Sequence, residues 1–295
     1  MDAVTDNNLL PGPLIDAKWL VTHLDAVAVF DSRRYGDGRS GREQFELGHI
    51  PGAVFVDLDV DLSAPAAAPG TPGGRHPFPT AQDFAAAMGR LGYDGSRPAV
   101  IYDDVGGGMA ARMWFMLDLV GIPAAVLDGG LVAWTGELET GAPSVESVEF
   151  ATRPWPVDRL VSADEVAARL EGGAVVLDAR NTSRFIGREN RLDDRYGHIP
   201  GAISRAWEDN VDDFTGAMLA IEQLAERFAT VTAAADAAMT GDVPRPVAYC
   251  GSGVTACHNL LALRLLGADA DLYVGSWSEW GSDESRPLKT GPSLQ

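Results

Sequence analysis

The chain repeats itself once, and this internal repeat constrains the fold more than any other feature of the sequence. The hexapeptide GHIPGA occurs at 48–53 and again at 197–202, 149 residues further on. An apolar run that ends in Asp-x-Arg precedes each copy, at 27–33 and at 174–180. Two further pairs of matching segments keep the same spacing to within three residues. The sequence therefore predicts one domain of ordinary size that is duplicated, rather than a short-period solenoid.

Each copy alternates short apolar runs with helical patterns. The runs VVLDAR and PVAYC are typical of buried strands, and helices are expected over 80–92 and 162–170. Thr80 and Ser162 are suitable N-caps, and Glu165 stands at the capping-box position for Ser162. This alternation predicts an α/β fold in which each domain is a mostly parallel sheet with helices on both faces.

The repeat also predicts the domain boundaries. We expect a first domain at 1–140, a linker at 141–160 and a second domain at 161–295. The linker segment carries three prolines and shows no helical period. In sheets of this kind, ligands bind at the carboxyl ends of the strands.

Composition excludes several classes of function. The net charge is −19, from 23 basic and 42 acidic residues, which argues against non-specific nucleic-acid binding and against an anionic membrane as partner. The N-terminus shows no secretory signal, and the most apolar helical stretches are too short to span a bilayer. Two cysteines are too few for a disulfide framework or an all-cysteine zinc site. We expect a cytoplasmic protein without metal or organic cofactor, and the sequence does not indicate an oligomeric state.

Comparison of the two copies separates structural from functional candidates. Residues present in both copies are expected to serve the fold, with ring nitrogens bonded to backbone and arginines in ion pairs: His49, His198, Arg33 and Arg180. Three features occur once only. Cys250 stands where the first copy has Asp103, four arginines crowd into 182–197, and His76 follows a Gly/Pro/Ala stretch.

The loop CGSGVT, residues 250–255, runs from a strand end into a helix. Its backbone N–H groups and the helix dipole favour an anion at the Cys250 sulfur, so we predict a thiolate nucleophile. The alternative is an inert buried cysteine, which is common. The glycines let the backbone curl around the sulfur, and we expect the rest of the loop to contact substrate: Gly251, Gly253, Val254 and Thr255. Cys257, within the helix, is expected to be a buried bystander.

The loop itself limits what the sulfur can attack. A cysteine phosphatase needs an arginine six residues after the nucleophile, and here that position is Ala256. A cysteine protease needs a paired histidine. His258 lies in the following helix, and we expect it to point away, at the surface or behind the loop. A cradle of N–H groups without a fixed cation suits a sulfur that is either a thiolate or a persulfide.

The duplicated domains, the cysteine in the second copy only, GHIPGA in both copies and the closing GSWSEW together resemble the tandem-domain rhodanese family. Within it, CGSGVT is similar to the loop of 3-mercaptopyruvate sulfurtransferases, whereas thiosulfate-specific members carry basic residues after the cysteine. The resemblance implies that Cys250 takes a sulfane sulfur from a small anionic donor, 3-mercaptopyruvate or thiosulfate. The resulting persulfide passes the sulfur to cyanide or to a thiol, such as that of a thioredoxin-like protein. The alternative is a non-enzymatic persulfide carrier or binding module.

The resemblance also implies roles for other residues. Ser252 matches a serine that works with a histidine and an aspartate of the first copy, here His76 and Asp59, as a proton relay. Asp57 and Asp61 are close competitors of Asp59.

Arg184, in RFIG, matches the arginine that binds the donor carboxylate. A second family arginine normally follows, and here the spacing does not identify it, since three arginines compete: Arg188, Arg191 and Arg195.

Overall fold

The computed structural model describes residues 9–189 and 192–292. Its contacts divide the chain into two compact units. Unit 1 comprises the chain up to Ser63, Pro79–Trp155 and Val211–Met218, and unit 2 comprises Ala64–Phe78, Pro156–Asn210 and the chain from Leu219 onward. Two short segments are thus grouped away from their neighbours in sequence, 64–78 with unit 2 and 211–218 with unit 1. The boundaries predicted at 140 and 161 stay a prediction.

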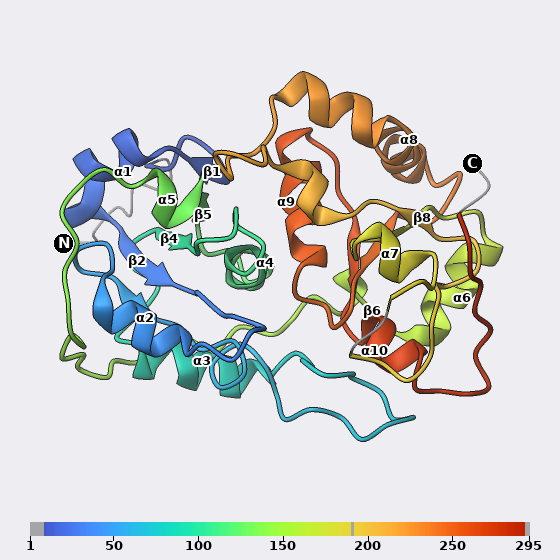
Figure 1. The fold of residues 1–295 in the computed structure, drawn as a ribbon, viewed down its shortest axis with the longest axis horizontal. Coiled ribbons are helices and arrows are strands. Elements are labelled where there is room, and N and C mark those ends of the chain that lie inside the picture. The colour runs from blue at the N-terminus through green and yellow to red at the C-terminus, as the bar shows by residue number, and fades with distance from the viewer. Residues whose placement is uncertain (1–8, 190–191, 293–295) are drawn as a thin grey trace. The chain divides into compact units, whose positions relative to one another are not determined.

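Each unit contains a sheet of five strands in which every pairing is parallel (Figure 1). In unit 1 the order is β1 (Leu14–Ile15), β5 (Ala124–Leu127), β4 (Ala99–Tyr102), β2 (Ala28–Asp31) and β3 (Val54–Phe55). In unit 2 it is β6 (Leu160–Val161), β10 (Asp271–Tyr273), β9 (Val247–Tyr249), β7 (Val176–Asp178) and β8 (Ile203–Ser204). The two orders are the same, so the duplicated α/β fold is confirmed, with β4 and β9 as the middle strands.

Helices cover both faces of the unit 1 sheet. The helices are α1 (Ala17–His23), α2 (Gly41–Leu47), α3 (Ala81–Arg90), α4 (Ala110–Leu119) and α5 (Gly130–Ala133), with a 3₁₀ turn η1 (Leu24–Ala26). Leu20 of α1 and Phe45 of α2 share one core with Val100 of β4. Successive strand residues point to opposite faces, so Ile101 faces the other side, where α4 packs on β4 and β5.

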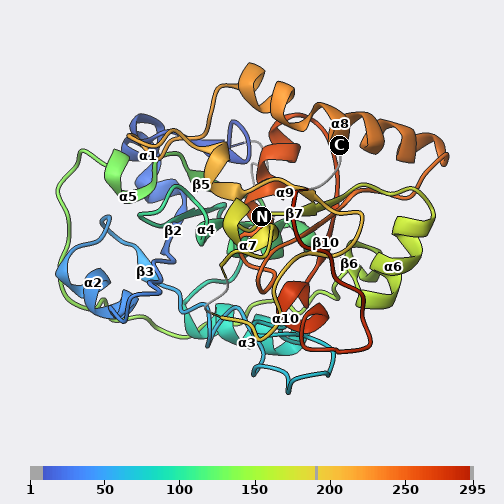
Figure 2. The ribbon, with the colours of Figure 1, turned by 45° about the vertical axis from the view of Figure 1, so that its right-hand side comes forward.

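Unit 2 is layered in the same way. Its helices are α6 (Ala163–Glu171), α7 (Thr182–Phe185), α8 (Ile221–Thr240), α9 (Ala256–Leu265) and α10 (Ser276–Trp280), with 3₁₀ turns η2 (Val157–Arg159) and η3 (Trp207–Asn210). Val166 of α6, Phe185 of α7 and Trp277 of α10 form one core with β9. Helix α9 packs on β9 and β10, with the long helix α8 against it (Figure 2).

The predicted helix starts are confirmed. The Thr80 hydroxyl accepts the Asp83 N–H at 3.1 Å before α3. Ser162 and Glu165 form the expected capping box before α6. Helix α9 begins directly after Thr255. Local hydrogen bonds therefore fix where α3 and α6 begin.

The Asp-x-Arg pairs are structural, as predicted. Arg33 bonds Asp31 at 2.7 Å and Arg180 bonds Asp178 at 2.6 Å, and all four side chains are nearly inaccessible. Each guanidinium also donates to the carbonyl of the glycine that opens GHIPGA, at 2.7 Å in both units. Burial acts to lower the pKa of Arg180, but the Asp178 carboxylate raises it, and the net shift is upward.

The repeated histidines are structural too. The Nδ1 atoms of His49 and His198 lie 2.8 Å from the carbonyl oxygens of Phe45 and Phe185. Each imidazole stacks on the ring of the same phenylalanine, at centroid distances of 3.9 and 3.8 Å. The role predicted for these histidines, with ring nitrogens bonded to backbone, is confirmed.

The loop that follows β4 in unit 1 is a cradle of backbone N–H groups filled by a carboxylate of the same chain. Asp103 is fully buried and accepts four of these N–H groups, from Val105 at 2.9 Å, Gly107 at 2.8 Å, Met109 at 2.7 Å and Ala110 at 2.9 Å. Burial raises the pKa of Asp103, and the four donors act to lower it. The loop thus binds an anion at the carboxyl end of the middle strand.

Across the described residues, none of the helices combines the length and the hydrophobicity that a membrane span requires.

Replacing Asp103 by alanine should strongly destabilise the protein. The change leaves four buried N–H groups without their acceptor, at about 1–3 kcal/mol for each one that water cannot reach. We expect the free energy of unfolding, measured by urea denaturation, to fall by at least about 3 kcal/mol. Asp236→Ala, on the exposed face of α8, is the matched control and should change it by less than about 0.5 kcal/mol. If the free energy of unfolding fell by a similarly small amount in both variants, the stabilising role of the four hydrogen bonds to Asp103 would be contradicted.

Candidate functional site

Cys250 lies directly after β9, in the same place as Asp103 in unit 1, and its loop is held by the start of α10. The Cys250 N–H donates to the Ser276 hydroxyl at 3.1 Å. The carbonyls of Cys250 and Gly251 accept the N–H groups of Trp277 and Ser278, at 3.0 and 2.9 Å. These three bonds fix the backbone on both sides of the sulfur.

Ser276 is itself in an unusual conformation. Its φ of +53° lies in the left-handed region, which residues other than glycine seldom adopt. The hydroxyl accepts from Cys250 and donates to the Tyr273 carbonyl at 2.9 Å. Strain of this kind persists where surrounding contacts hold it, and it is frequent at functional sites.

Glycine is favoured at two positions of the loop, for a different steric reason at each. Gly253 has a φ of +75°, and a Cβ there would lie 2.5 Å from the Val274 carbonyl oxygen. At Gly251 a Cβ would instead meet two guanidiniums, 3.0 Å from Nη2 of Arg184 and 3.2 Å from Nη2 of Arg75. Gly251 is therefore the point of the loop on which two cations converge.

Both cysteines are free and buried. Cys250 is 2% exposed, and Cys257, in α9, donates from its sulfur to the Gly253 carbonyl at 3.5 Å. Among the residues that the structure describes, none accepts a hydrogen bond from the backbone N–H groups of Ser252, Val254 or Thr255. In unit 1 the corresponding loop donates its N–H groups to Asp103. The loop of unit 2 thus has N–H groups for an anion, and it carries a sulfur in place of the carboxylate.

His76 reaches this loop. Its Nδ1 lies 2.7 Å from the Ser252 hydroxyl, and both residues are 8% exposed. The segment that carries His76 is fastened to α10, since the Gly73 N–H donates to Glu279 at 2.8 Å and the Arg75 N–H donates to Ser278 at 3.0 Å. Burial raises the pKa of Glu279, although the Gly73 N–H acts to lower it. Residues from the closing GSWSEW therefore place His76 against Ser252.

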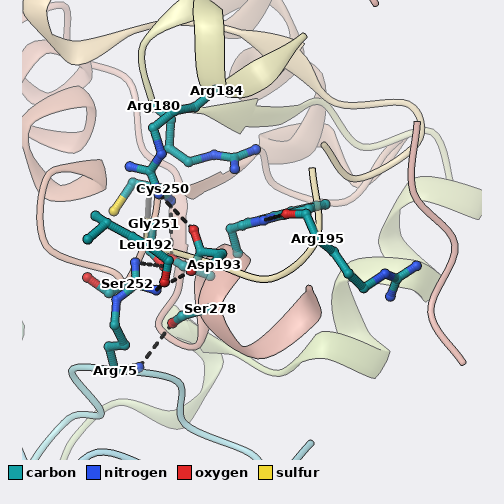
Figure 3. A network of polar contacts seen from close by, with 12 residues as sticks. Arg75, Arg180, Arg184, Leu192, Asp193, Arg195, Cys250, Gly251, Ser252 and Ser278 are labelled. Atoms are coloured by element: carbon teal, nitrogen blue, oxygen red, sulfur yellow. Dashed lines mark hydrogen bonds and ion pairs between the residues drawn. The ribbon is translucent and has the colours of Figure 1, made fainter. Parts of the chain in front are cut away.

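Two arginines and one aspartate complete the site (Figure 3). Arg184, in a short helix capped by Asn181 at 2.9 Å, pairs with Asp193 at 2.9 Å. Arg75 pairs with the other carboxylate oxygen of Asp193 and donates to the Gly251 carbonyl at 3.3 Å. The loop lacks a basic residue, as the sequence indicates, but the expectation of a cradle without a fixed cation is wrong, because these cations come from other segments.

The other predicted arginines lie elsewhere or are not described. Arg195 donates to the carbonyls of Asp283 at 2.7 Å and Arg286 at 3.0 Å, and its guanidinium points away from Cys250 (Figure 3). Arg188 is exposed. Arg191 lies outside the described residues. Substrate binding by any of these arginines stays a prediction.

Asp59 belongs to unit 1, where it pairs with Arg34 at 3.2 Å and its side chain is 55% exposed. The two alternative candidates for the relay aspartate, Asp57 and Asp61, have other partners. Asp57 accepts the Asp59 N–H at 2.9 Å, and the nearly buried Asp61 pairs with Arg90 at 3.3 Å. The place of Asp59 in a relay with His76 stays a prediction.

His258 is fully buried, so of the two expected positions the one behind the loop is correct and the surface is not. Its Nδ1 lies 3.2 Å from the Asn210 amide nitrogen, which also donates to Asn259 at 2.7 Å. Arg227 donates to the Asn210 oxygen at 2.9 Å. These bonds tie α9 to η3 and α8.

Sequence reasoning missed Arg75 and its ion pair with Asp193. Arg75 adjoins His76 in the non-repeated GGRHPFPT, and Asp193 lies in the non-repeated arginine-rich segment. The signal available was the absence of both segments from the first copy.

Comparisons with known proteins identify the family to which the chain belongs. Two parts of the chain, residues 16–137 and 162–283, match the family described as Rhodanese-like domain. A probable 3-mercaptopyruvate sulfurtransferase of Pseudomonas aeruginosa is 41% identical over 262 residues, 86% of this chain and 89% of the relative. SseB of Mycobacterium tuberculosis, named as a thiosulfate sulfurtransferase, is 37% identical over 274 residues, 90% of this chain and 92% of the relative. The solved 3-mercaptopyruvate sulfurtransferase from Leishmania major superposes with a TM-score of 0.80 at 29% identity, over 95% of this chain and 77% of that chain.

The chain belongs to the rhodanese-like domain family, of which it carries two copies in tandem. It is a sulfurtransferase.

Replacing Gly251 by alanine should weaken donor binding without unfolding the protein. The added Cβ must push both guanidinium ends by a few tenths of an ångström, which flexible side chains can accommodate. We expect the KM for the sulfur donor to rise about 3- to 10-fold, with kcat changed less than about twofold, in steady-state assays. Gly36→Ala, where no atom lies within 4 Å of the new Cβ, is the control. An unchanged KM would contradict the convergence of the arginines on Gly251.

Proposed function

We propose that the protein moves a sulfane sulfur from 3-mercaptopyruvate to a thiol or cyanide acceptor through a persulfide on Cys250. One contact carries the choice of donor: the 2.7 Å hydrogen bond between His76 and Ser252, two residues after the cysteine. A proton relay at that place is needed by a donor that leaves as an enolate. The mercaptopyruvate sulfurtransferases among the relatives support the same choice.

In the first half-reaction the Cys250 thiolate attacks the donor sulfur. A sulfur–sulfur bond forms, the carbon–sulfur bond of the donor breaks, and its electron pair leaves with the carbon as the enolate of pyruvate. The Cys250 thiol and 3-mercaptopyruvate together become the Cys250 persulfide and pyruvate, so one proton must move from sulfur to carbon. Covalent catalysis of this kind divides the transfer into two steps.

Ser252 and His76 move that proton. The Ser252 hydroxyl lies on the reactive loop, and the imidazole beside it takes a proton and returns it to the enolate carbon. Asp59 would complete this relay.

Arg184 binds the donor carboxylate. Its guanidinium lies next to Gly251, and its planar fork matches a carboxylate with two hydrogen bonds. The backbone of the loop, from Gly251 through Gly253 and Val254 to Thr255, stabilises the charge on the transferred sulfur. Desolvation in this buried site strengthens each of these interactions.

Thiosulfate is the second donor that we propose. It gives up its outer sulfur and leaves as sulfite, which carries the electron pair without any proton transfer to carbon. The thiosulfate sulfurtransferase name of one relative supports this alternative.

In the second half-reaction a thiol attacks the outer sulfur of the persulfide and returns Cys250 to its thiol form. We infer that a small protein thiol, such as a thioredoxin-like protein, is the acceptor, and that the protein works in the reducing cytoplasm. The two free cysteines support a reducing compartment.

Cys250→Ser should abolish turnover, whereas the matched variant Cys257→Ser should keep it, because only Cys250 forms the covalent intermediate. We expect a loss of at least about a thousandfold with either donor. Mass spectrometry after incubation with donor should show one added sulfur on wild type and Cys257→Ser, and none on Cys250→Ser. Stable charging without turnover once a thiol is added would instead favour a sulfur carrier.

Ser252→Ala should reduce kcat with 3-mercaptopyruvate by about 10²-fold and kcat with thiosulfate by much less, because only the enolate must be protonated. His76→Gln should show the same difference between donors. Rates are measured for both donors at saturation, and Thr232→Ala, which removes a hydroxyl that donates only to the Ala229 carbonyl within α8, serves as the control for loss of a hydroxyl. Equal losses with both donors would refute the relay.

A further inference from the structure

The two guanidiniums that converge on Gly251 are already bound to a carboxylate of the chain itself. Asp193 offers one oxygen to Arg75 and the other to Arg184, the latter at 2.9 Å. The Asp193 side chain is 6% exposed, whereas those of Arg184 and Arg75 are 18% and 31% exposed, so the carboxylate is largely shielded from water. Its carboxylate lies beside Gly251, where the two guanidiniums converge (Figure 3).

The pairing with Arg184 uses only half of the guanidinium fork. Nη2 of Arg184 donates to Asp193, whereas the buried Nε beside it has no acceptor among the described residues. A carboxylate that approaches Arg184 squarely would bond Nε and Nη2 together, which is the stronger and more specific arrangement. A buried donor without a partner costs free energy, so Arg184 retains unused affinity for a better-placed carboxylate.

Arg75 is fixed more firmly than Arg184. Its backbone N–H donates to Ser278 at 3.0 Å, and Nη2 donates to the Gly251 carbonyl at 3.3 Å. Nη1 donates to the Leu192 carbonyl at 3.2 Å as well as to Asp193. Arg75 is therefore a cation held on the reactive loop whether or not Asp193 stays in place.

A small cavity opens beside this cluster. It has a volume of about 160 Å³, and its lining includes Arg75, Asp193, Asp194 and Ser278. Pockets for drug-sized ligands usually measure roughly 300–1,000 Å³, so this one admits only a small molecule. Two larger cavities, of 500 and 440 Å³, lie in unit 1 and contain neither cysteine.

We propose that Asp193 is a built-in competitor for the carboxylate of the sulfur donor. It occupies Arg75 and Arg184 in the free protein, and a 2-oxo acid donor displaces it and takes both guanidiniums. Asp193 then sets the affinity of the site and favours donors whose carboxylate satisfies the Arg184 fork over thiols without one. Arg75 becomes the second donor-binding arginine, which sequence spacing does not identify. This inference rests on the proposed 2-oxo acid donor.

Removing the Asp193 charge tests the competition directly. Only molecules in which Asp193 has left the arginines can bind the donor carboxylate, so a small fraction of such molecules weakens the apparent affinity. Asp193→Asn should raise this fraction and tighten anion binding by about 3- to 10-fold. The probe is pyruvate, and its Kd is measured by calorimetry in the Cys250→Ser background, where no turnover occurs. Asp236→Asn, the same charge change on an exposed residue of α8, should alter the Kd by less than about twofold. Adding Arg75→Gln to Asp193→Asn should weaken binding again, by about tenfold.

With Cys250 intact, Asp193→Asn should lower the KM for 3-mercaptopyruvate by the same factor and leave kcat within about twofold. Weaker or unchanged pyruvate binding in Asp193→Asn would refute the competition and make Asp193 a residue that positions the arginines. If none of the variants binds pyruvate, the competition is refuted as well. The proposed function fails separately, since a protein that forms no Cys250 persulfide refutes that function however Asp193 behaves.

Discussion

The backbone loop after the middle strand of each sheet is the constraint on which the rest of the structure depends. A strand end that leads into a helix presents N–H groups that require an acceptor. In unit 1 the Asp103 carboxylate accepts four of them in the interior. In unit 2 the same place holds Cys250, whose loop is fixed by Ser276 and the start of α10. A loop built to bind an anion therefore stabilises the fold in one unit and suits an anionic sulfur in the other.

The fold was predictable because its determinants are local or repeated. The Thr80 cap and the Ser162–Glu165 capping box each depend on residues three positions apart, and both form as expected. The Asp-x-Arg pairs occur once in each copy, and comparison of the copies identified them as structural. Because the chain is duplicated, a prediction made for one copy applies to the other, and the strand orders of the two sheets are indeed the same.

The site was predictable only in part, because its arginines belong to segments that are distant from Cys250 in the sequence. Arg75 and Asp193 are 118 residues apart, and no periodicity in either segment indicates their ion pair. Cys250 and Ser252 follow from the loop itself, and His76 lies against Ser252 as the resemblance implies. The surface position considered for His258 failed for a related reason. Polar residues within a helix usually face water, but here Asn210, 48 residues upstream, provides a buried partner.

The absence of a side chain at Gly251 connects these observations. Two guanidiniums fill the space that a Cβ would need, so the reactive loop gains positive charge without carrying a basic residue. A lysine or arginine at position 251 would bring a cation on the loop itself and displace both. Cations from other segments have a different property, since each can also pair with a carboxylate side chain of the chain itself. The donor must then offer better geometry than Asp193, so affinity depends on how well its carboxylate fits the Arg184 fork rather than on net charge alone.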